Sequence, residues 1–218
     1  MVASVHLTNN DTGDDILLKP NSDNIIEITS DYNNWTIDGA TASGGSTTGT
    51  TVVIDEGVTV DGDGWRLGTT TATASVTVNG ILTLRNSDII NAGSKVIVGD
   101  GGTLVLGGYA TTTSDLIEFS GSANTPAGGG GTIEIAAGTT PSIIGYITNI
   151  TDNDTIIIDG MTADNYTYVD GIYTLTSNGT PINGTSSFQL PAANEGTKFT
   201  VTTPVSYTHL TLPTILLV

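Results

Sequence analysis

The sequence predicts an all-β fold, a right-handed parallel β-helix (β-solenoid) with an irregular N-terminal capping section. Residues 75–108 are the clearest evidence, because they read as short runs of alternating apolar residues, each closed by Gly, Asn or Asp. Strands this short, with so few residues between them, fit successive coils better than a β-sandwich. The composition agrees, since the chain has 28 Gly residues and only 6% aromatic residues.

A repeat of about 24 residues is the second observation. Val52 and Val76 begin equivalent apolar runs 24 residues apart, and Val58 and Leu82 are separated by the same interval. The third strand of each triplet recurs after 23 residues. Three strands recurring at this period are what a three-faced β-helix requires, with alternate aliphatic side chains stacked inside.

Residues 1–50 are predicted to be an irregular set of strands that covers one end of the solenoid, followed by a linker. Apolar runs at 16–18, 25–28 and 35–37 are separated by clusters of Asp and Asn, which favour turns. The Gly, Ser and Thr residues at 40–50 indicate a linker or a long loop. The end of a solenoid needs such a cover because its last coil would otherwise be exposed.

The β-helix coils are predicted to run from residue 51 to residue 141. The intervals between strands become irregular in the second half of this region, where 109–115 and 120–131 are predicted to be loops. Loops held on a rigid scaffold are the places where binding is expected.

The sequence pattern changes in residues 142–204. The motifs there are NDTIII at 153–158, GIYTLT at 171–176 and GTKFTV at 196–201. Over residues 142–203 they resemble the repeats of bacterial autotransporter and haemagglutinin-like adhesins, which are large exported proteins. The resemblance implies further β-solenoid coils, a surface location and a passenger or stalk without catalysis.

Residues 205–218 are predicted to be non-native. Residues 205–214 read VSYTHLTLPT, which resembles the translation of a transposase sequencing adapter at every position. We therefore exclude 205–218 from functional reasoning, as one excludes a cloning scar. The chain is expected to be a fragment of a longer protein, and its first residues show no signal peptide.

The charge pattern argues against several classes of partner. The formal net charge is −17 with only five Lys and Arg residues, which argues against nucleic acids and anionic membrane surfaces. The sequence contains no run of 18 apolar residues, so no membrane span is predicted. The chain has no Cys, so disulfides and thiolate metal sites are excluded. Divalent cations or simple solvation of the carboxylates remain as interpretations.

Asp61 and Asp63 are the candidate metal ligands. Two carboxylates two residues apart in a Gly-containing turn could share a calcium ion. A complete EF-hand loop would also need ligands where Trp65 and Ala72 stand. Calcium is therefore the only cofactor that the sequence offers, and a solvated acidic turn is the alternative interpretation.

A carbohydrate-active β-helix, such as a polysaccharide lyase, a hydrolase or a phage tailspike, is the alternative function. Glycosidases use two carboxylates, and lyases use a base beside a stabilising cation. Arg66 and Arg85 lie in adjacent predicted coils, close in sequence to Asp61, Asp63 and Asp88. A groove that holds two or three of these acids with either arginine would favour an enzyme.

Tyr166 and Tyr168 are the candidate ligand-binding residues. They stand at alternate positions of a predicted strand and could stack on a sugar, with packing against a neighbouring coil as the alternative. No catalytic or cofactor-binding residue is predicted. The leading hypothesis is a non-catalytic structural or adhesive segment of an exported bacterial surface protein, outside the cell, in contact with host-surface or extracellular polysaccharide or protein.

Overall fold

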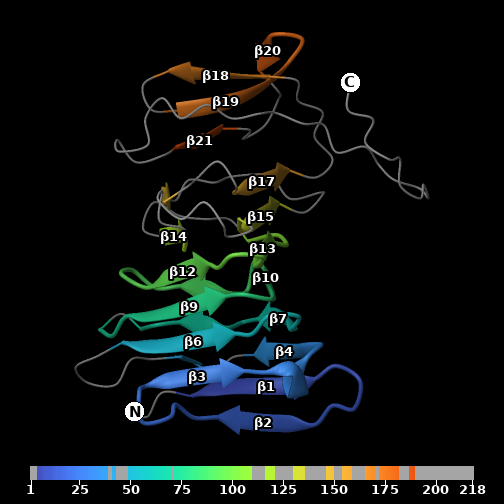
Figure 1. Cartoon of the computed structure of the whole chain (residues 1–218), viewed down its shortest axis with the longest axis vertical. Helices are drawn as coiled ribbons and strands as arrows, with labels where there is room; N and C mark the ends of the chain where they lie inside the picture. Colours follow the sequence, from blue (N-terminus) through green and yellow to red (C-terminus); the bar gives the residue numbers. More distant parts are fainter. Residues whose placement is uncertain are drawn as a thin grey trace, which may run out of the picture.

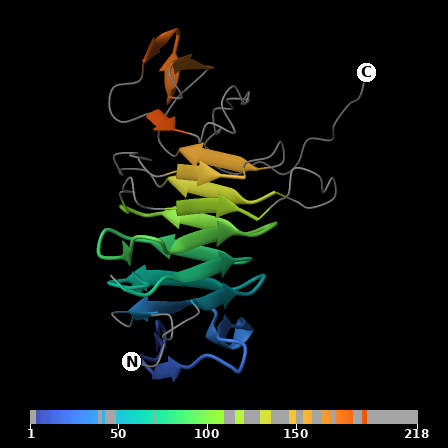
Figure 2. The same ribbon diagram turned by 90° about the vertical axis from the view of Figure 1, so that its left-hand side faces the viewer.

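The computed structural model is an all-β solenoid. Its parallel sheets stack as about four turns, which confirms the predicted fold class. Figures 1 and 2 show the coils rising from the N-terminal end as successive layers. The structure describes residues 4–38, 41–42, 49–69, 71–109, 116–120, 130–135, 146–149, 154–158, 165–169, 172–181 and 187–189.

Three sheets form the sides of the solenoid. The strands of the first sheet are β1 (Val5–Asn9), β2 (Asp15–Leu18), β4 (Trp35–Asp38), β7 (Thr59–Asp63), β10 (Ile81–Leu84), β13 (Thr103–Leu106), β15 (Thr132–Ile135) and β17 (Thr155–Ile158). The second sheet contains β3 (Ile25–Ile28), β6 (Thr50–Ile54), β9 (Ala74–Val78), β12 (Lys95–Val98), β14 (Leu116–Phe119) and β16 (Tyr146–Thr148). The third contains β5 (Thr41–Ala42), β8 (Arg66–Leu67) and β11 (Ile89–Ile90), and a 3-10 turn, η1 (Ser30–Tyr32), precedes β4.

Strict alternation along each strand builds the core. Every second residue points inward, so that buried aliphatic side chains of one coil lie on those of the next. Fully burying one such side chain stabilises the fold by roughly 1.5–3 kcal/mol. One of the inner columns of the second sheet consists of Ile26, Val52, Val76, Val96, Ile117 and Ile147.

The predicted register is confirmed on one sheet and wrong on another. Val52 pairs with Val76, as the interval of 24 residues predicts. Leu82 pairs with Val60, however, and not with Val58. A shift of two residues leaves the same side chains inside, so alternation in the sequence cannot distinguish the two registers.

The coils begin earlier than the predicted start at residue 51. Strands β3, β4 and β5 already pair in parallel with β6, β7 and β8. The Asn residues that predicted turns do form them, because Asn24 and Asn34 adopt φ values of 65° and 64° immediately before β3 and β4. At this end of the solenoid, β1 and β2 depart from the parallel order, as an antiparallel hairpin whose β1 also pairs antiparallel with β4.

The prediction of further coils in residues 142–204 holds for β16 and β17, which pair in parallel with β14 and β15, and is wrong for the described strands that follow them. A two-residue Asn178-Gly179 turn with φ values of 51° and 75° reverses the chain, and the adhesin-like motifs do not reveal this turn. Figure 2 shows the resulting sheet at the end of the molecule away from the N-terminus. This antiparallel sheet contains β18 (Asn165–Val169), β19 (Ile172–Ser177), β20 (Thr180–Pro181) and β21 (Ser187–Gln189).

The predicted adapter segment at 205–218 lies outside the described residues. The same is true of most of the two predicted loops, at 110–115 and 121–129. Within the described part of the chain, no helix is both long enough and apolar enough to span a membrane.

Candidate functional site

The corner between the first and third sheets contains the predicted acidic residues. Asp61 and Asp63 both point outward from β7, since alternation places Gly62 inside between them. Asp61 is half-buried and Asp63 is exposed. The next coil passes this corner between β10 and β11, and its turn supplies the partners of both carboxylates.

Arg85 binds Asp61 across the coils. The guanidinium Nη2 lies 2.8 Å from Oδ2 of Asp61. The two side chains are 49% and 34% exposed, so this ion pair contributes at most about 1 kcal/mol. Arg66, by contrast, makes no ion pair with a described carboxylate. The pairing means that the positive charge of Arg85 already balances one of the two predicted calcium ligands.

Ser87 bonds to the side chain of Asp63 and to the backbone of Gly64, the next residue along the chain. The Ser87 hydroxyl lies 3.3 Å from Oδ1 of Asp63, to which it donates, and its oxygen accepts the N–H of Gly64 at 3.1 Å. All three residues are at the surface of the turn. Asp63 is therefore held by one weak contact and keeps most of its carboxylate facing solvent.

Asp88 is a buried acid, with 4% of its surface exposed. Its carboxylate accepts the backbone N–H of Trp65 at 2.8 Å and that of Arg85 at 2.6 Å. Burial raises the pKa of this carboxyl above its ordinary value of 3.8; the hydrogen bonds from Arg85 and Trp65 oppose the rise, and the charge of Asp63 adds to it. The carboxylate links two coils and has little contact with solvent.

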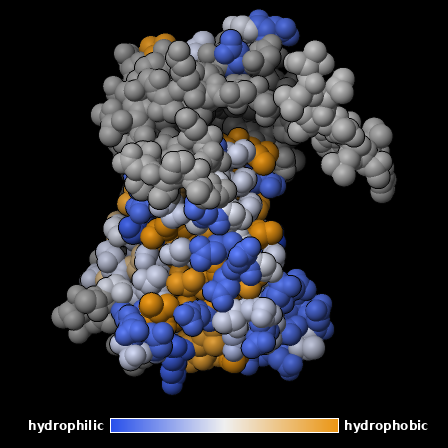
Figure 3. Space-filling model, in the orientation of Figure 1, coloured by the Kyte–Doolittle hydropathy of each residue, from blue (hydrophilic) through white to orange (hydrophobic). Residues whose placement is uncertain are grey.

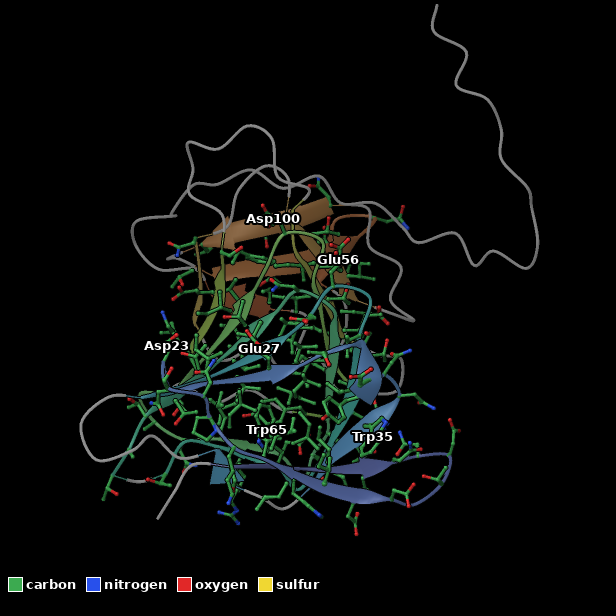
Figure 4. The ribbon with its side chains drawn as sticks, turned by 60° about the horizontal axis from the view of Figure 1, so that its bottom comes forward. Asp23, Glu27, Trp35, Glu56, Trp65 and Asp100 are labelled. Atoms are coloured by element: carbon green, nitrogen blue, oxygen red, sulfur yellow. The ribbon has the colours of Figure 1, made fainter. Side chains whose placement is uncertain are left out.

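The absence of a side chain at Gly62 leaves room for the Asp88 carboxylate. A Cβ atom on Gly62 would collide with the Asp88 carboxylate, so a larger residue at this inward position would displace that carboxylate. Figure 4 shows Trp65 inside the ring of strands. Its side chain is buried, and its indole Nε1–H has no hydrogen-bond partner among the described residues. An unsatisfied donor of this kind costs about 1–3 kcal/mol.

A shallow hollow lies beside the corner. Its volume is about 470 Å³ and it is open to solvent. Thr83 of β10 pairs with Val105 of β13. The same register, extended beyond the strands, sets Gly107 over Arg85 and Gly108 over Asn86. The hollow is thus the space that two missing side chains leave over a polar turn. It is lined by Arg85, Asn86, Ser87, Gly107 and Gly108.

The chemistry available at this corner is limited. The described residues contain no group of three or more His, Asp or Glu side chains that could hold a metal ion. Asp61 faces a cation of the protein itself, and Asp88 is enclosed by backbone donors. Only Asp63 offers an open carboxylate, and calcium binding at Asp61 and Asp63 remains a prediction.

The predicted tyrosine pair lies in a different part of the fold. Tyr166 and Tyr168 occupy alternate positions of β18, opposite Leu175 and Tyr173 of β19. The strand assignment agrees with the sequence, whereas a sugar platform at these residues remains a prediction. They belong to the antiparallel sheet and not to a solenoid coil, and the alternative of packing against a neighbouring coil also stays a prediction.

Two contacts were not found from the sequence. The predicted 23-residue interval aligns Trp65 with Asp88, but nothing in it shows that the carboxylate turns inward. Lys95 in β12 binds both carboxylate oxygens of Glu118 in β14 at 3.2 Å. Lys95 stands opposite Leu116, so this pair runs diagonally between coils and only the register could predict it.

The fold and its corner define a parallel β-solenoid with coil-to-coil polar contacts. Comparison with protein families, with curated proteins and with solved structures finds no match for this chain.

Proposed function

We propose that this chain is a non-catalytic structural segment of an exported bacterial surface protein, which serves as a rigid rod and carries adhesive contacts. The observation that supports the rod is the parallel stacking of the described strands of the first and second sheets from β3 to β17, with aliphatic side chains inside. Each coil pairs along its strands with the next, so the stack resists bending and local opening.

The positions of the charged groups support a structural role. Glu118 is paired with Lys95 and Asp61 with Arg85, while Asp88 satisfies two backbone donors. An enzyme needs carboxylates that are free to exchange protons with substrate. At this corner only Asp63 meets that condition, and one open carboxylate is fewer than a glycosidase uses.

The proposed location is outside the cell, and the proposed partners are extracellular or host-surface polysaccharide or protein. The motifs of residues 142–203 that resemble adhesin repeats support this location. The acidic surplus supports it in a general way, because charge keeps an extended rod soluble and separate from its neighbours.

The experiment that tests this proposal measures retention and turnover together. The purified chain is passed over an immobilised neutral glucan and an immobilised uronic-acid polymer, and the release of reducing ends is followed. We expect retention on at least one surface and no release above that of buffer. Release that is lost in Asp63→Asn, with the fold intact by circular dichroism, would contradict the proposal.

A carbohydrate-active β-helix is the second candidate, favoured by one specific observation. Arg85 and Ser87 line the hollow and bind Asp61 and Asp63 respectively, which is the kind of grouping that an enzyme of this class would need. If this candidate is right, Arg85→Gln and Asp63→Asn each abolish turnover. If the corner is structural, both variants bind and release as the parent protein does.

A further inference from the structure

The outer edge of β2 ends the first sheet at the N-terminal end of the solenoid. Among the described strands, β2 pairs only with β1. Figure 1 shows it beyond β1, at the extremity of the molecule. An edge strand presents backbone N–H and C=O groups that can pair with another chain.

The hairpin contacts settle which backbone groups of β2 face outward. The N–H of Asn9 donates to the C=O of Asp14 at 2.8 Å, so this pair is hydrogen-bonded. Hydrogen-bonded and non-bonded pairs alternate along an antiparallel ladder, and the even-numbered residues of β2 therefore bond toward β1. The N–H and C=O groups of Asp15 and Leu17 point away from β1, toward the open edge.

The side chains along this edge are apolar at the centre and oppositely charged at the two ends. Leu17 is 51% exposed, one of the few large apolar residues at the described surface. Asp15 and Lys19 flank it and are also exposed. Ile16 and Leu18 pack against the core, which fixes the strand in place. Figure 3 shows apolar and strongly polar residues side by side at this lower end of the molecule.

We propose that β2 pairs in antiparallel fashion with β2 of a second copy of this chain, centred on Leu17. This register sets Leu17 opposite Leu17 of the second copy and Asp15 opposite Lys19 of the second copy, twice by symmetry. Asp15 and Leu17 have their backbone groups on the outer side, as an antiparallel ladder requires, and Lys19 directly follows the end of β2. Two solenoids are thereby joined end to end through one continuous first sheet.

The charges select this arrangement among the alternatives. A parallel pairing sets Asp15 beside Asp15 of the second copy, and a register shifted by two residues sets Asp15 opposite Leu17. Asp, Lys and the following Pro20 are residue types that keep edges from pairing with wrong partners. Here the same charges repel most partners and are complementary to their own copy.

The proposed β2–β2 dimer is expected to be weak. A short edge buries far less than the roughly 1,600 Å² of a standard interface. The net charge of −17 also opposes dimerisation, although salt screens charges more than about 8 Å apart at physiological ionic strength. We therefore expect dimers at high protein concentration in physiological salt.

A charge swap tests the register. Sedimentation of the full chain is measured from about 0.01 to 1 mM, the range expected for so small an interface. We expect the parent protein to dimerise, Lys19→Asp to bind roughly tenfold more weakly, and Asp15→Lys with Lys19→Asp to recover the parent affinity. A parent protein that stays monomeric overturns the proposal, as does a double variant that folds and remains as weak as the single one.

A single cysteine tests the geometry independently. The chain has no Cys, so Leu17→Cys supplies its only thiol. Opposed residues of a bonded antiparallel pair have Cα atoms about 5.5 Å apart, within the range of a disulfide. We expect a disulfide-linked dimer on mild oxidation, formed much faster than by Ile89→Cys, a 37% exposed position on the third sheet. Equal rates for the two variants overturn the proposal.

Discussion

Removal of the Asp88 carboxylate is the sharpest perturbation that the structure offers. In Asp88→Ala the backbone N–H groups of Trp65 and Arg85 lose their acceptor. Trp65 is fully buried, so its N–H bears the full cost of an unsatisfied donor, about 1–3 kcal/mol. The N–H of Arg85 lies near the surface, where water can replace the acceptor at a smaller cost.

The net effect includes a compensating gain. A buried carboxylate with a raised pKa is itself held in the folded state at a cost, and alanine removes that cost. The hydrogen bonds from Arg85 and Trp65 oppose this cost without cancelling it, since the pKa stays raised. The unsatisfied backbone N–H of Trp65 therefore sets the size of the loss. We expect Asp88→Ala to lower the free energy of unfolding by about 1–3 kcal/mol, and Asp88→Asn, which keeps one acceptor oxygen, to lower it by about half as much.

Urea unfolding at neutral pH, followed by tryptophan fluorescence, measures this loss. Trp65 lies inside the ring of strands (Figure 4), and because its backbone N–H donates to Asp88, its fluorescence reports on the corner. Asn86→Ala is the matched control, because this exposed residue belongs to the same turn and should change stability by less than about 0.5 kcal/mol. A loss below about 1 kcal/mol in Asp88→Ala would refute the structural role of the carboxylate.

The pH dependence of stability in the parent protein and in Asp88→Asn provides a second test. Because the pKa of Asp88 is raised in the folded state, the folded protein binds a proton at a higher pH than the unfolded chain does. The contribution of Asp88 to stability therefore rises as pH falls from neutral toward the ordinary value of 3.8. The stability difference between the parent protein and Asp88→Asn should widen over that interval; a constant or narrowing difference contradicts a raised pKa.

Three further predictions concern other parts of the solenoid. Lys95→Gln should lower stability by less than about 1 kcal/mol, and the loss should vanish at 1 M salt, because the pair with Glu118 is partly exposed. Leu104→Ala should lower it by about 2–5 kcal/mol in urea unfolding, since this side chain is fully buried between coils. If calcium binds at the acidic turn, millimolar calcium should raise the melting temperature of the parent protein and leave that of Asp63→Asn unchanged, and equal responses would exclude this turn.

The sequence predicts the solenoid because alternation and turn residues are local properties. Each strand shows which residues point inward, and each Gly or Asn marks a corner. The pairing of one coil with the next is not a local property. The sequence interval aligns Leu82 with Val58, whereas Leu82 pairs with Val60 in the structure, an error of two residues. Turn length sets the register, and turns of different length leave the same alternating pattern.

The candidate site follows from register and was therefore only partly predictable. Asp61 and Arg85 appear in the sequence as neighbours in successive coils, but their contact depends on the pairing of β7 with β10. The inward turn of Asp88 depends on the empty space at Gly62, which no pattern of charge reveals. The antiparallel strands from Asn165 onward were missed because their motifs resemble solenoid repeats, although the Asn178-Gly179 pair between β19 and β20 is a hairpin signal in the sequence.

The stability of Asp88 and Asp63 variants also separates the two functional proposals. Active sites hold charged groups in unfavourable positions, so that removing a catalytic carboxylate commonly leaves stability unchanged or raises it. A structural carboxylate behaves in the opposite way, because its hydrogen bonds are part of the fold. If Asp88→Ala destabilises the protein while Asp63→Asn changes neither stability nor turnover, the corner is a joint of the rod. If Asp63→Asn stabilises the protein and abolishes turnover, the corner is an active site built on the same joint.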